Sequence, residues 1–332
     1  MPNLLFSILA DLSDGRFHSG EALAKKYNIS RVSVWNAVSE AEKIGVDIFS
    51  VRGKGYKLTQ PITLMDEKII KKAIGENASW FNVEVLDIVD STNTLMMQKS
   101  ATGYPHASCL VANIQTAGKG RRGRRWESAL GQNLTFSFLW RFTQGAAMLS
   151  GLSLVIGIAL IRAFQKVGLN QALLKWPNDV LIFHENIHKK LAGILIELQG
   201  DMEGQSIAVI GIGINLDLSK KQKDKIDQPA IDIKSCVKDK IEPNELLALI
   251  IKELATALSD FETKGFVTIK EEWKKYHAFQ DKVIALTKGD GQIIHGRVSD
   301  ISDDGAIVIS NEKGEQTFSS GEVSIMKERL GQ

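Results

Sequence analysis

Cysteine is scarce in this chain of 332 residues, which has only Cys109 and Cys236. Two cysteines cannot build a disulfide scaffold, and this pair is not spaced as metal ligands are. We therefore expect a protein of a reducing compartment, the cytoplasm. An excess of charge of one sign is also missing, because 41 lysines and arginines stand against 39 acidic residues, for a net charge of +2. Any contact with nucleic acid must therefore come from a local basic patch.

Long hydrophobic runs are scarce as well. The first twelve residues carry Asp11 and no basic segment, so they do not have the pattern of a secretory signal. Residues 142–161 contain no charged residue and are about long enough to cross a membrane. They also contain polar side chains and three glycines. A buried core helix is the better interpretation, and we expect no contact with a membrane.

The composition changes along the chain, which contains no internal repeat. Hydrophobic residues make up 44% and charged residues 24%, as in a folded globular protein. Residues 1–60 are rich in helix starts, residues 79–275 alternate apolar strands with helices, and residues 280–330 form short strands between glycine and aspartate turns. We expect residues 61–78 to be a linker. This pattern predicts an α+β protein of three domains, with a mixed α/β sheet in the central one.

Residues 1–60 predict a winged helix-turn-helix. Ser19 and Ser30 are placed to cap a second and a third helix, and Gly45 ends the third. Residues 47–58 then alternate as two strands around a basic turn. The third helix of such a fold enters the major groove of DNA, and the wing contacts phosphates. We therefore expect DNA binding by a helix-turn-helix at about residues 20–39 and by the wing, through Ser30, Arg31, Ser33, Trp35, Asn36, Ser39, Arg52 and Lys54.

Two alternatives stay open for this first domain. Its eight lysines and arginines exceed its six acids only slightly, so a small module for protein interaction has a similar pattern. Trp35 could belong to the core instead of the DNA-reading face, because an exposed tryptophan on such a helix is uncommon.

The densest chemistry lies between Gln115 and Trp126, where five cationic residues and no acid fall within residues 119–125. Residues 118–123 formally match a dinucleotide fingerprint. That fingerprint needs glycines that open an apolar helix, whereas arginines fill this one. An arginine–glycine tract for RNA is a second alternative, which one element in a strand-rich domain supports poorly. We favour a flexible cationic loop for a small anion that carries carboxylate and phosphate charge.

Three further segments fit such an anion site. Residues 175–179 place a lysine, a tryptophan and an aspartate around a proline turn. Lys190 opens an apolar strand, where it could hold an anionic reacting group, although a plain surface lysine is the ordinary alternative. A buried strand over 207–216 has glycines at 211 and 213, which would let a flat ligand approach the backbone.

In their order, these segments resemble the motifs of biotin–protein ligases. The motifs are Asp90-Ser-Thr-Asn93, Gly118-Lys-Gly-Arg-Arg-Gly123, Lys175-Trp-Pro-Asn-Asp179, Lys190-Leu-Ala-Gly-Ile194 and Gly211-Ile-Gly-Ile-Asn215. With the winged helix, essentially the whole chain resembles the bifunctional form, which is both ligase and repressor of the biotin biosynthesis genes. The resemblance implies that residues 79–275 form the ligase domain. It also implies that residues 280–330 form an SH3-like β-barrel that helps to hold ATP or the carrier protein.

The resemblance implies a reaction in two steps with biotin, ATP and Mg²⁺. The biotin carboxylate attacks the α-phosphorus of ATP, which gives biotinyl-5′-AMP and pyrophosphate. A lysine of the biotin carboxyl carrier protein of acetyl-CoA carboxylase then attacks the mixed anhydride, and AMP leaves. The other implied partners are operator DNA and a second copy of the chain, which would form a homodimer when biotinyl-5′-AMP is bound and acts as corepressor.

The resemblance also assigns residues to these steps. Lys190 and Arg121 would be catalytic, and Asp179 is a candidate Mg²⁺ ligand, with capping of its turn as the alternative. Biotin would be bound by Ser91, Thr92, Asn93, Gln115, Lys119, Gly120, Arg121 and Lys190. ATP and the adenylate would be bound by Arg122, Trp126, Asn178, Gly213 and Asn215.

Two positions depart from the family pattern, and two other functions compete with this assignment. Lys119 stands where arginine is usual, and Ala230, in a predicted second adenylate loop over 219–233, stands where relatives often have tryptophan. A lipoate–protein ligase shares the fold and the adenylate chemistry, but the winged helix and the arginine loop argue against it. A biotin-sensing transcription factor without catalysis is the other alternative, against which Arg121 and Lys190 count.

Overall fold

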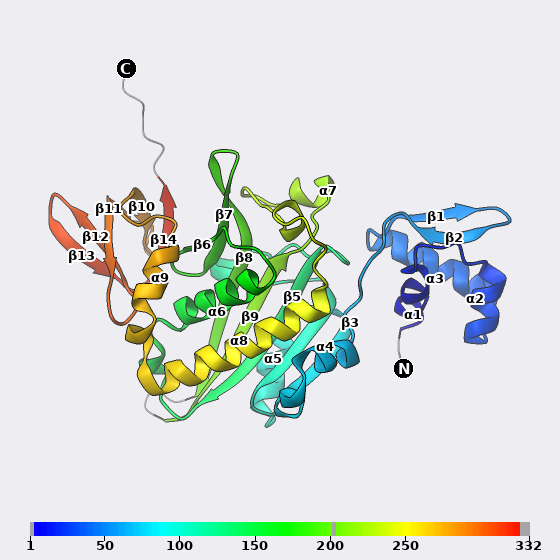
Figure 1. The fold of residues 1–332 in the computed structure, drawn as a ribbon, viewed down its shortest axis with the longest axis horizontal. Helices are drawn as coiled ribbons and strands as arrows, with labels where there is room; N and C mark the ends of the chain where they lie inside the picture. Colours follow the sequence, from blue (N-terminus) through cyan, green and yellow to red (C-terminus); the bar gives the residue numbers. More distant parts are fainter. Residues whose placement is uncertain (1–2, 201–203, 326–332) are drawn as a thin grey trace, which may run out of the picture.

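A computed structural model describes residues 3–200 and 204–325 of the chain, in an N-terminal, a central and a C-terminal domain (Figure 1). The N-terminal domain has three helices and a two-stranded antiparallel wing. Its elements are α1 (Leu4–Leu12), α2 (Gly20–Tyr27), α3 (Arg31–Lys43), β1 (Ile48–Val51) and β2 (Gly55–Leu58). This is the predicted winged helix-turn-helix.

The predicted capping residues set the limits of these helices. The hydroxyls of Ser19 and Ser30 accept hydrogen bonds from the backbone N–H groups of Ala22 and Ser33, both at 3.0 Å. Gly45, which follows the C-terminal cap Ile44 of α3, has a φ of 89°, which favours glycine. The predicted caps at Ser19 and Ser30 and the predicted helix end at Gly45 are therefore confirmed.

The segment expected as a linker contains an ordered helix. Helix α4 (Glu67–Ile74) begins at Asp66, whose carboxylate accepts from the Ile69 N–H at 2.9 Å. Ile70 and Ile74 are buried in the core of the central domain, so this part of residues 61–78 is folded onto that domain. Ile62 instead packs against the core of the N-terminal domain.

The central domain is built on a seven-stranded mixed sheet in the order β3-β4-β5-β9-β8-β7-β6. The pair β3–β4 is parallel, and the other neighbours are antiparallel. The strands are β3 (Asn82–Val89), β4 (Ser108–Gln115), β5 (Asn133–Phe142), β6 (Ala172–Lys175), β7 (Asp179–His184), β8 (Ile187–Gly200) and β9 (Ser206–Asn215). Both faces of the central strands are buried, as their near-continuous apolar runs predict.

Helices cover the sheet on both sides. Helices α6 and α8 cross one face (Figure 1), and α5 packs on the other through Met96, which meets Leu110, Leu139 and Val209. The helices are α5 (Thr92–Ala101), α6 (Leu152–Lys166), α7 (Lys220–Lys223), α8 (Pro243–Lys264) and α9 (Lys270–Tyr276), with short 3-10 turns η1 (Glu76–Trp80), η2 (Arg121–Gly123), η3 (Ala146–Leu149), η4 (Ile233–Ser235) and η5 (Phe266–Thr268).

The uncharged stretch 142–161 is not one helix. It comprises the end of β5, the turn η3 and the first part of α6, whose apolar residues are buried in the central core. Among the residues that the structure describes, no helix is long and apolar enough to cross a membrane.

The C-terminal domain is a five-stranded antiparallel sheet in the order β13-β12-β11-β10-β14. It is docked on the central domain by its tight turn at Asp304-Gly305. The indole N–H of Trp176 donates to the Gly305 carbonyl at 3.0 Å, and Ser150 Oγ donates to the Asp304 carbonyl at 2.7 Å. The strands are β10 (Val283–Thr287), β11 (Ile293–Ile301), β12 (Ile307–Asn311), β13 (Gly314–Phe318) and β14 (Glu322–Ile325).

Candidate active site

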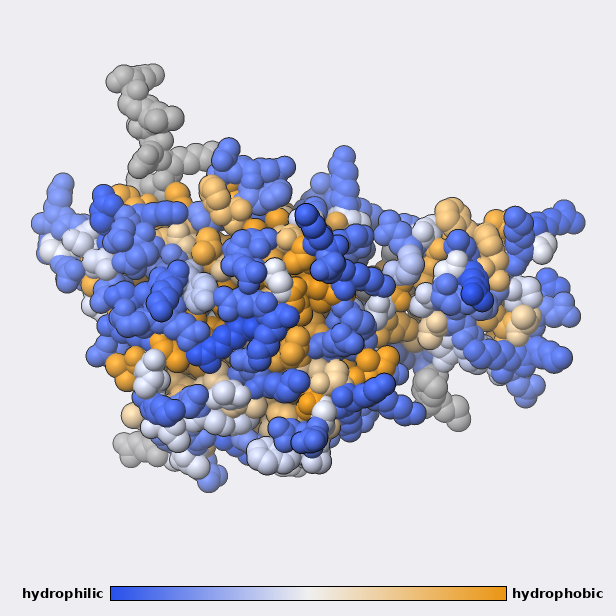
Figure 2. Space-filling model, in the orientation of Figure 1, coloured by the Kyte–Doolittle hydropathy of each residue, from blue (hydrophilic) through white to orange (hydrophobic). Residues whose placement is uncertain are grey.

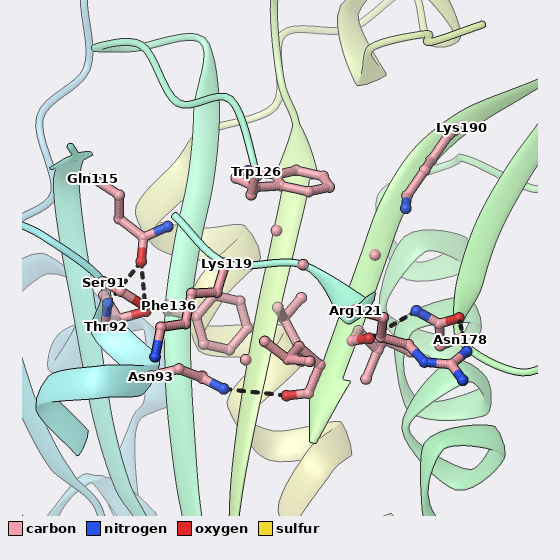
Figure 3. Close-up of a pocket in the computed structure, with 17 residues that line it drawn as sticks. Ser91, Thr92, Asn93, Gln115, Lys119, Arg121, Trp126, Phe136, Asn178 and Lys190 are labelled. Carbon is pink, nitrogen blue, oxygen red and sulfur yellow. Dashed lines mark hydrogen bonds between the residues drawn. The ribbon is translucent and has the colours of Figure 1, made fainter. Parts of the chain in front are cut away.

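One pocket in the central domain gathers most of the predicted site residues. It lies over β8 and β9, between the start of α5, the end of β4, the loop after β4 and the turn before β7. Figure 3 shows Ser91, Thr92, Asn93 and Gln115 at one end with the side chain of Lys119 beside them, Arg121 and Lys190 at the other end, and Trp126 above the space between. The lining includes Ser91, Thr92, Asn93, Gln115, Lys119, Gly120, Arg121, Trp126, Phe136, Asn178, Lys190, Gly193 and Gly213.

The neutral end is a buried hydrogen-bond network. Gln115 Oε1 accepts from the Thr92 N–H at 2.7 Å and lies 3.0 Å from Thr92 Oγ1. Ser137 Oγ lies 2.6 Å from Asn93 Oδ1 and 2.8 Å from Thr92 Oγ1. Asn93 Nδ2 donates to Glu197 Oε2 at 2.9 Å. Because each side chain is held by others, this end offers fixed donors and acceptors to a neutral polar group.

Two glycines of β9 make room for this packing. A Cβ atom at Gly211 would lie 2.3 Å from Asn93 Oδ1, and one at Gly213 would lie 2.3 Å from Trp126 Cε2. Both glycines also line the pocket, so the approach of a flat ligand to this backbone stays a prediction. The glycines seat Asn93 and Trp126 against the sheet.

The cationic loop, residues 118–126, forms a tight turn closed by backbone hydrogen bonds. Gly120 N–H donates to the Arg124 carbonyl at 2.8 Å, and Trp126 N–H donates to the Gly118 carbonyl at 2.9 Å. At its tip Arg122 has a φ of 56°. These bonds turn the side chain of Arg121 inward, where Nη1 donates to Asn178 Oδ1 at 2.8 Å. Burial lowers the pKa of Arg121 below its usual value.

Lys190 completes the cationic end from strand β8. Its Nζ lies 2.8 Å from Asp179 Oδ1 and 5.8 Å from the centre of the Trp126 ring. Lys175 Nζ is 4.0 Å from the other oxygen of Asp179, and burial lowers the pKa of Lys175. One carboxylate is thus surrounded by several cations, so the site favours an added anion.

A second pocket continues from this end to the C-terminal domain. It is lined by Arg122, Arg124, Lys175 and Asp179 of the central domain and by Glu322 of β14, among others. Glu322 forms an ion pair with Arg124 and lies 3.7 Å from Arg122. Burial alone would raise the pKa of Glu322, but the hydrogen bond from Arg124 lowers it below its usual value. The C-terminal domain therefore holds the outer arginines of the loop.

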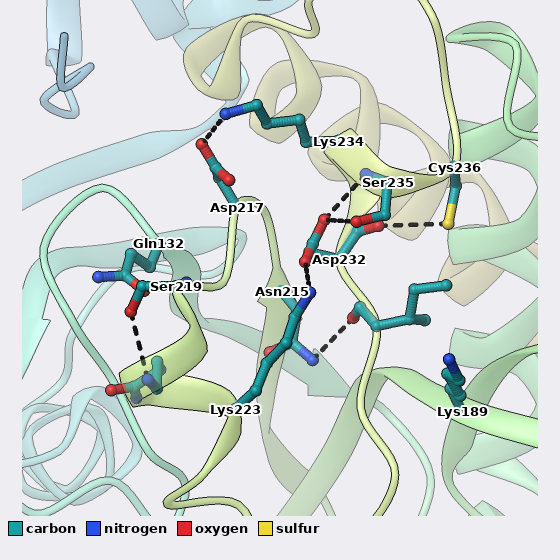
Figure 4. Close-up of polar contacts among 12 residues, drawn as sticks. Gln132, Lys189, Asn215, Asp217, Ser219, Lys223, Asp232, Lys234, Ser235 and Cys236 are labelled. Atoms are coloured by element: carbon teal, nitrogen blue, oxygen red, sulfur yellow. Dashed lines mark hydrogen bonds and ion pairs between the residues drawn. The ribbon is translucent and has the colours of Figure 1, made fainter. Parts of the chain in front are cut away.

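A third pocket lies between Trp126, Asn215, Ala230 and the end of Lys190. Asn215 Nδ2 lies 3.2 Å from the Lys190 carbonyl and 3.1 Å from the Ile231 carbonyl, so this amide ties the second loop to strand β8 (Figure 4). Lys223 pairs with the buried Asp232 at 2.8 Å. The indole N–H of Trp126 is buried and has no hydrogen-bond partner among the described residues, which leaves it free for a ligand.

The structure thus gathers the predicted site residues of the central domain into three adjoining pockets. The sequence patterns did not single out three further residues that contact residues of these pockets, Ser137, Glu197 and Glu322. The sequence did contain a signal for Ser137, because Asn133, Thr135 and Ser137 alternate with large apolar residues in one strand. It also contained a signal for Glu197, which is the single acid of an apolar strand. Glu322 had no local signal, since its partners lie about two hundred residues earlier. Residues 3–200 and 204–325 contain no cluster of three or more histidine, cysteine or acidic side chains that could hold a metal.

The predicted DNA-contacting residues lie on the N-terminal domain, away from these pockets. Arg31, Trp35 and Asn36 are exposed on α3, and Arg52 and Lys54 are exposed on the wing turn. Ser30 serves as the helix cap, and Ser33 and Ser39 are half-buried. Trp35 is therefore not a core residue. The core side of α3 is formed by Val34, Ala37, Val38 and Ala41, most of which the sequence predicted.

Comparison with known families gives matches for all three domains. Residues 85–215 match the Biotin/lipoate A/B protein ligase family, residues 5–57 match an HTH domain, and residues 282–326 match the Biotin protein ligase C terminal domain.

Individual proteins are similar over most of the chain. The chain is 37% identical to the bifunctional ligase/repressor BirA of Salmonella typhimurium, over 98% of this chain and 97% of that protein. It is 35% identical to BirA of Escherichia coli, over 96% of each. Among solved structures, the Aquifex aeolicus biotin protein ligase in complex with biotin and ATP is 30% identical, with a TM-score of 0.62 over 74% of this chain and 99% of that one.

Proposed function

The chain belongs to the biotin protein ligase family, among the bifunctional ligase/repressors, and from this premise we propose that it activates biotin with ATP and transfers it to a lysine of a carrier protein. One observation carries the proposal. A fixed neutral polar network at one end of a pocket and the cations Arg121 and Lys190 at the other match a molecule with a polar ring and a carboxylate tail.

The first step brings two anions together, and the residues fit that task. The biotin ring would bind at Thr92, Asn93 and Gln115, with its carboxylate toward Arg121 and Lys190. There the carboxylate would attack the α-phosphorus of ATP, and pyrophosphate would leave. Because like charges repel, buried cations that are already oriented lower this barrier most. Lys190, held by Asp179, would contact both the biotin carboxyl oxygen and the α-phosphate.

The nucleotide would extend into the adjoining pockets. Trp126, with its free indole N–H, would pack against the adenylate beside Asn215 and Ala230. The remaining phosphates would lie toward Arg122 and Lys175 in the second pocket. Magnesium that arrives with ATP is held mostly by phosphate oxygens and water, so one carboxylate from the protein suffices. Asp179 would take this role by exchanging its contacts with Lys190 and Lys175 for the metal, and bound magnesium would neutralise phosphate charge.

The second step needs a partner. The lysine amine of a biotin carboxyl carrier protein would attack the anhydride carbonyl, and AMP would leave. Lys190 would again stabilise the negative charge that develops on the carbonyl oxygen. The small number of cysteines favours the cytoplasm as the location.

The winged helix would serve repression of biotin biosynthesis genes. We propose that biotinyl-5′-AMP favours a homodimer, which places two copies of α3 on a two-fold related operator. Ser30, Arg31, Ser33, Trp35, Asn36 and Ser39 of the helix-turn-helix, with Arg52 and Lys54 of the wing, would face the DNA.

The test compares three acids. The full chain is incubated with ATP, Mg²⁺ and biotin, lipoate or no acid, and pyrophosphate is measured. A carrier domain is then added and weighed by mass spectrometry. We expect pyrophosphate with biotin alone and one biotinyl group on one lysine. Pyrophosphate with lipoate instead would favour the lipoate ligase alternative, and none with either acid would favour a sensor without catalysis.

A further inference from the structure

We propose that Val32 and Trp35 read thymine by contact with its 5-methyl group, which makes them specificity-determining residues of the DNA-binding domain. The inference rests on the proposed binding of DNA by α3 and goes further, because it names the base that these side chains recognise and the chemical group that they contact.

The first observation is an apolar pair on the outer side of α3. Val32 is 66% exposed and Trp35 is 58% exposed, whereas Val34 and Val38 on the other side are buried. Residues three apart on a helix are neighbours on its surface, so Val32 and Trp35 form one small apolar area. Figure 2 shows hydrophobic residues at the surface of this domain among hydrophilic ones. Single exposed apolar side chains are common on folded proteins, but two that adjoin on the helix expected to read DNA form a surface that a ligand can contact.

The second observation is where this pair lies along the helix. Helix α3 begins at Arg31, so Val32 and Trp35 fall in its first two turns. In helix-turn-helix proteins, the N-terminal residues of this helix contact base edges in the major groove. Arg31 and Asn36 are exposed beside the pair, and their side chains suit guanine and adenine edges respectively. The apolar pair therefore lies between groups that can read bases.

The charges around the pair favour DNA over a protein as the occupant. Helix α3 has no acidic residue before Glu40, and Arg52 is exposed on the wing turn of the same domain. Lys54 and Lys57 both lie over the ring of Phe17, at 5.9 and 5.8 Å, which fixes further positive charge on the wing. An apolar pair next to Arg31, on a helix without nearby acids and in a domain with a cationic wing, matches a groove that is lined by phosphates.

The chemistry of the groove selects the base. The 5-methyl group of thymine is the apolar group that the major groove presents, and apolar side chains contact it. Uracil pairs identically but lacks this methyl group. Loss of one buried methyl costs about 0.8 kcal/mol, which is about fourfold in affinity. Substitution of uracil for thymine therefore tests this contact and leaves the hydrogen-bond pattern of the base pair unchanged.

The experiment uses the full chain with ATP, Mg²⁺ and biotin. A random duplex library is selected for binding, and the best duplex is made with thymine and with uracil at every thymine position. The ratio of the two dissociation constants is measured for the wild type, for Val32→Ala, Trp35→Ala and the double variant, and for Phe49→Ala. Phe49, which is 51% exposed on the wing strand β1, is the matched control for loss of an exposed aromatic side chain. Circular dichroism and thermal unfolding check that each variant is folded.

We expect the wild type to prefer the thymine duplex by about fourfold for each contacted methyl, and the double variant to lose that preference. Phe49→Ala should keep the wild-type ratio. Equal binding of both duplexes by the wild type would overturn the inference, as would an unchanged ratio in the double variant. Failure of the folded wild type to enrich any duplex would overturn the proposed DNA binding itself and this inference with it. The two failures are therefore distinguishable.

Discussion

Lys190 Nζ lies 2.8 Å from Asp179 Oδ1, although the two residues reach the site from neighbouring strands, β8 and β7. Both side chains are mostly buried. The ion pair orients the lysine before any substrate binds, and a β-bulge between Val180 and Leu181 adjusts the register of the two strands next to it. A cation that is oriented in advance stabilises a transition state without the cost of reorganisation.

This relationship gives the first prediction. Lys190→Ala should slow adenylate formation by about 10² to 10³. In comparable sites, removal of one preorganised group that stabilises the charge of the transition state raises the activation free energy by about 2.7–4 kcal/mol. Asp179→Asn should lose less activity, because Lys190 itself remains and only the charge that orients it is lost. Single-turnover formation of biotinyl-5′-AMP measures both rates. A Lys190→Ala rate equal to the wild type would remove Lys190 from the mechanism.

The second prediction concerns retention of the intermediate. Arg121 donates to Asn178 at 2.8 Å and so closes the arginine loop over the pocket. Arg121→Gly should release biotinyl-5′-AMP faster than the wild type, and Asn178→Ala should reproduce part of that effect. Arg125→Gly is the control, because Arg125 lies on the exposed side of the same loop. Release of labelled adenylate into a chase of unlabelled biotin gives the off-rate. Equal off-rates for Arg121→Gly and the control would show that the loop does not cover the intermediate.

Stability should depend on pH through His277. This histidine is buried between the rings of Trp273 and Phe279, and burial lowers its pKa from 6.5 to about 4. The unfolded chain therefore takes up a proton near pH 6.5, which the folded chain resists until about pH 4. Stability should be unaffected above pH 7 and fall between pH 6.5 and 4, by roughly 2 kcal/mol at pH 5.

Urea unfolding at pH 7 and pH 5 measures this loss. His277→Gln should lose less stability between the two pH values than the wild type, because glutamine does not titrate. His184→Gln, at an exposed histidine on the β7–β8 hairpin, is the control and should behave as the wild type does. Equal pH dependence in all three proteins would assign the acid sensitivity to other groups.

Much of the fold could be predicted from the sequence, because its signals are local. Ser19, Ser30 and Gly45 mark helix limits through bonds to their own neighbours, and the glycine–arginine loop is defined within a dozen residues. These features need no knowledge of the rest of the chain.

Other features could not be predicted, because they depend on contacts between distant segments. The ion pair of Arg124 with Glu322 joins the arginine loop to the last described strand. The helix α4 was taken for a linker, since its apolar side is explained only by the helix α8 that covers it. The sequence also does not reveal that Asn93 and Trp126 pack against the glycines of β9, since these side chains come from segments far from that strand.

The last prediction concerns coupling between the ligand and the dimer. The second loop is tied to β8 at Lys190, since Lys190 N–H donates to the Pro229 carbonyl at 2.8 Å and Ile231 N–H donates to the Lys190 carbonyl at 3.0 Å. An adenylate held between Trp126 and this loop would therefore stabilise the closed loop. If the closed loop forms part of the surface that pairs with a second copy, biotinyl-5′-AMP binds the dimer more tightly than the monomer. The ligand then shifts the equilibrium toward the dimer.

Sedimentation and operator binding, each with and without biotinyl-5′-AMP, should thus show a ligand-dependent dimer that binds DNA more tightly than the monomer does. Ala230→Trp should strengthen this dependence, because an indole at the third pocket adds apolar contact with the adenylate where alanine leaves space. Carrier protein should compete with dimerisation if both use the face on which the activated biotin is exposed. Equal dimerisation with and without the adenylate, in the wild type and in Ala230→Trp, would disprove the coupling and leave the ligase activity unaffected, because the two steps of catalysis need only one copy of the pocket.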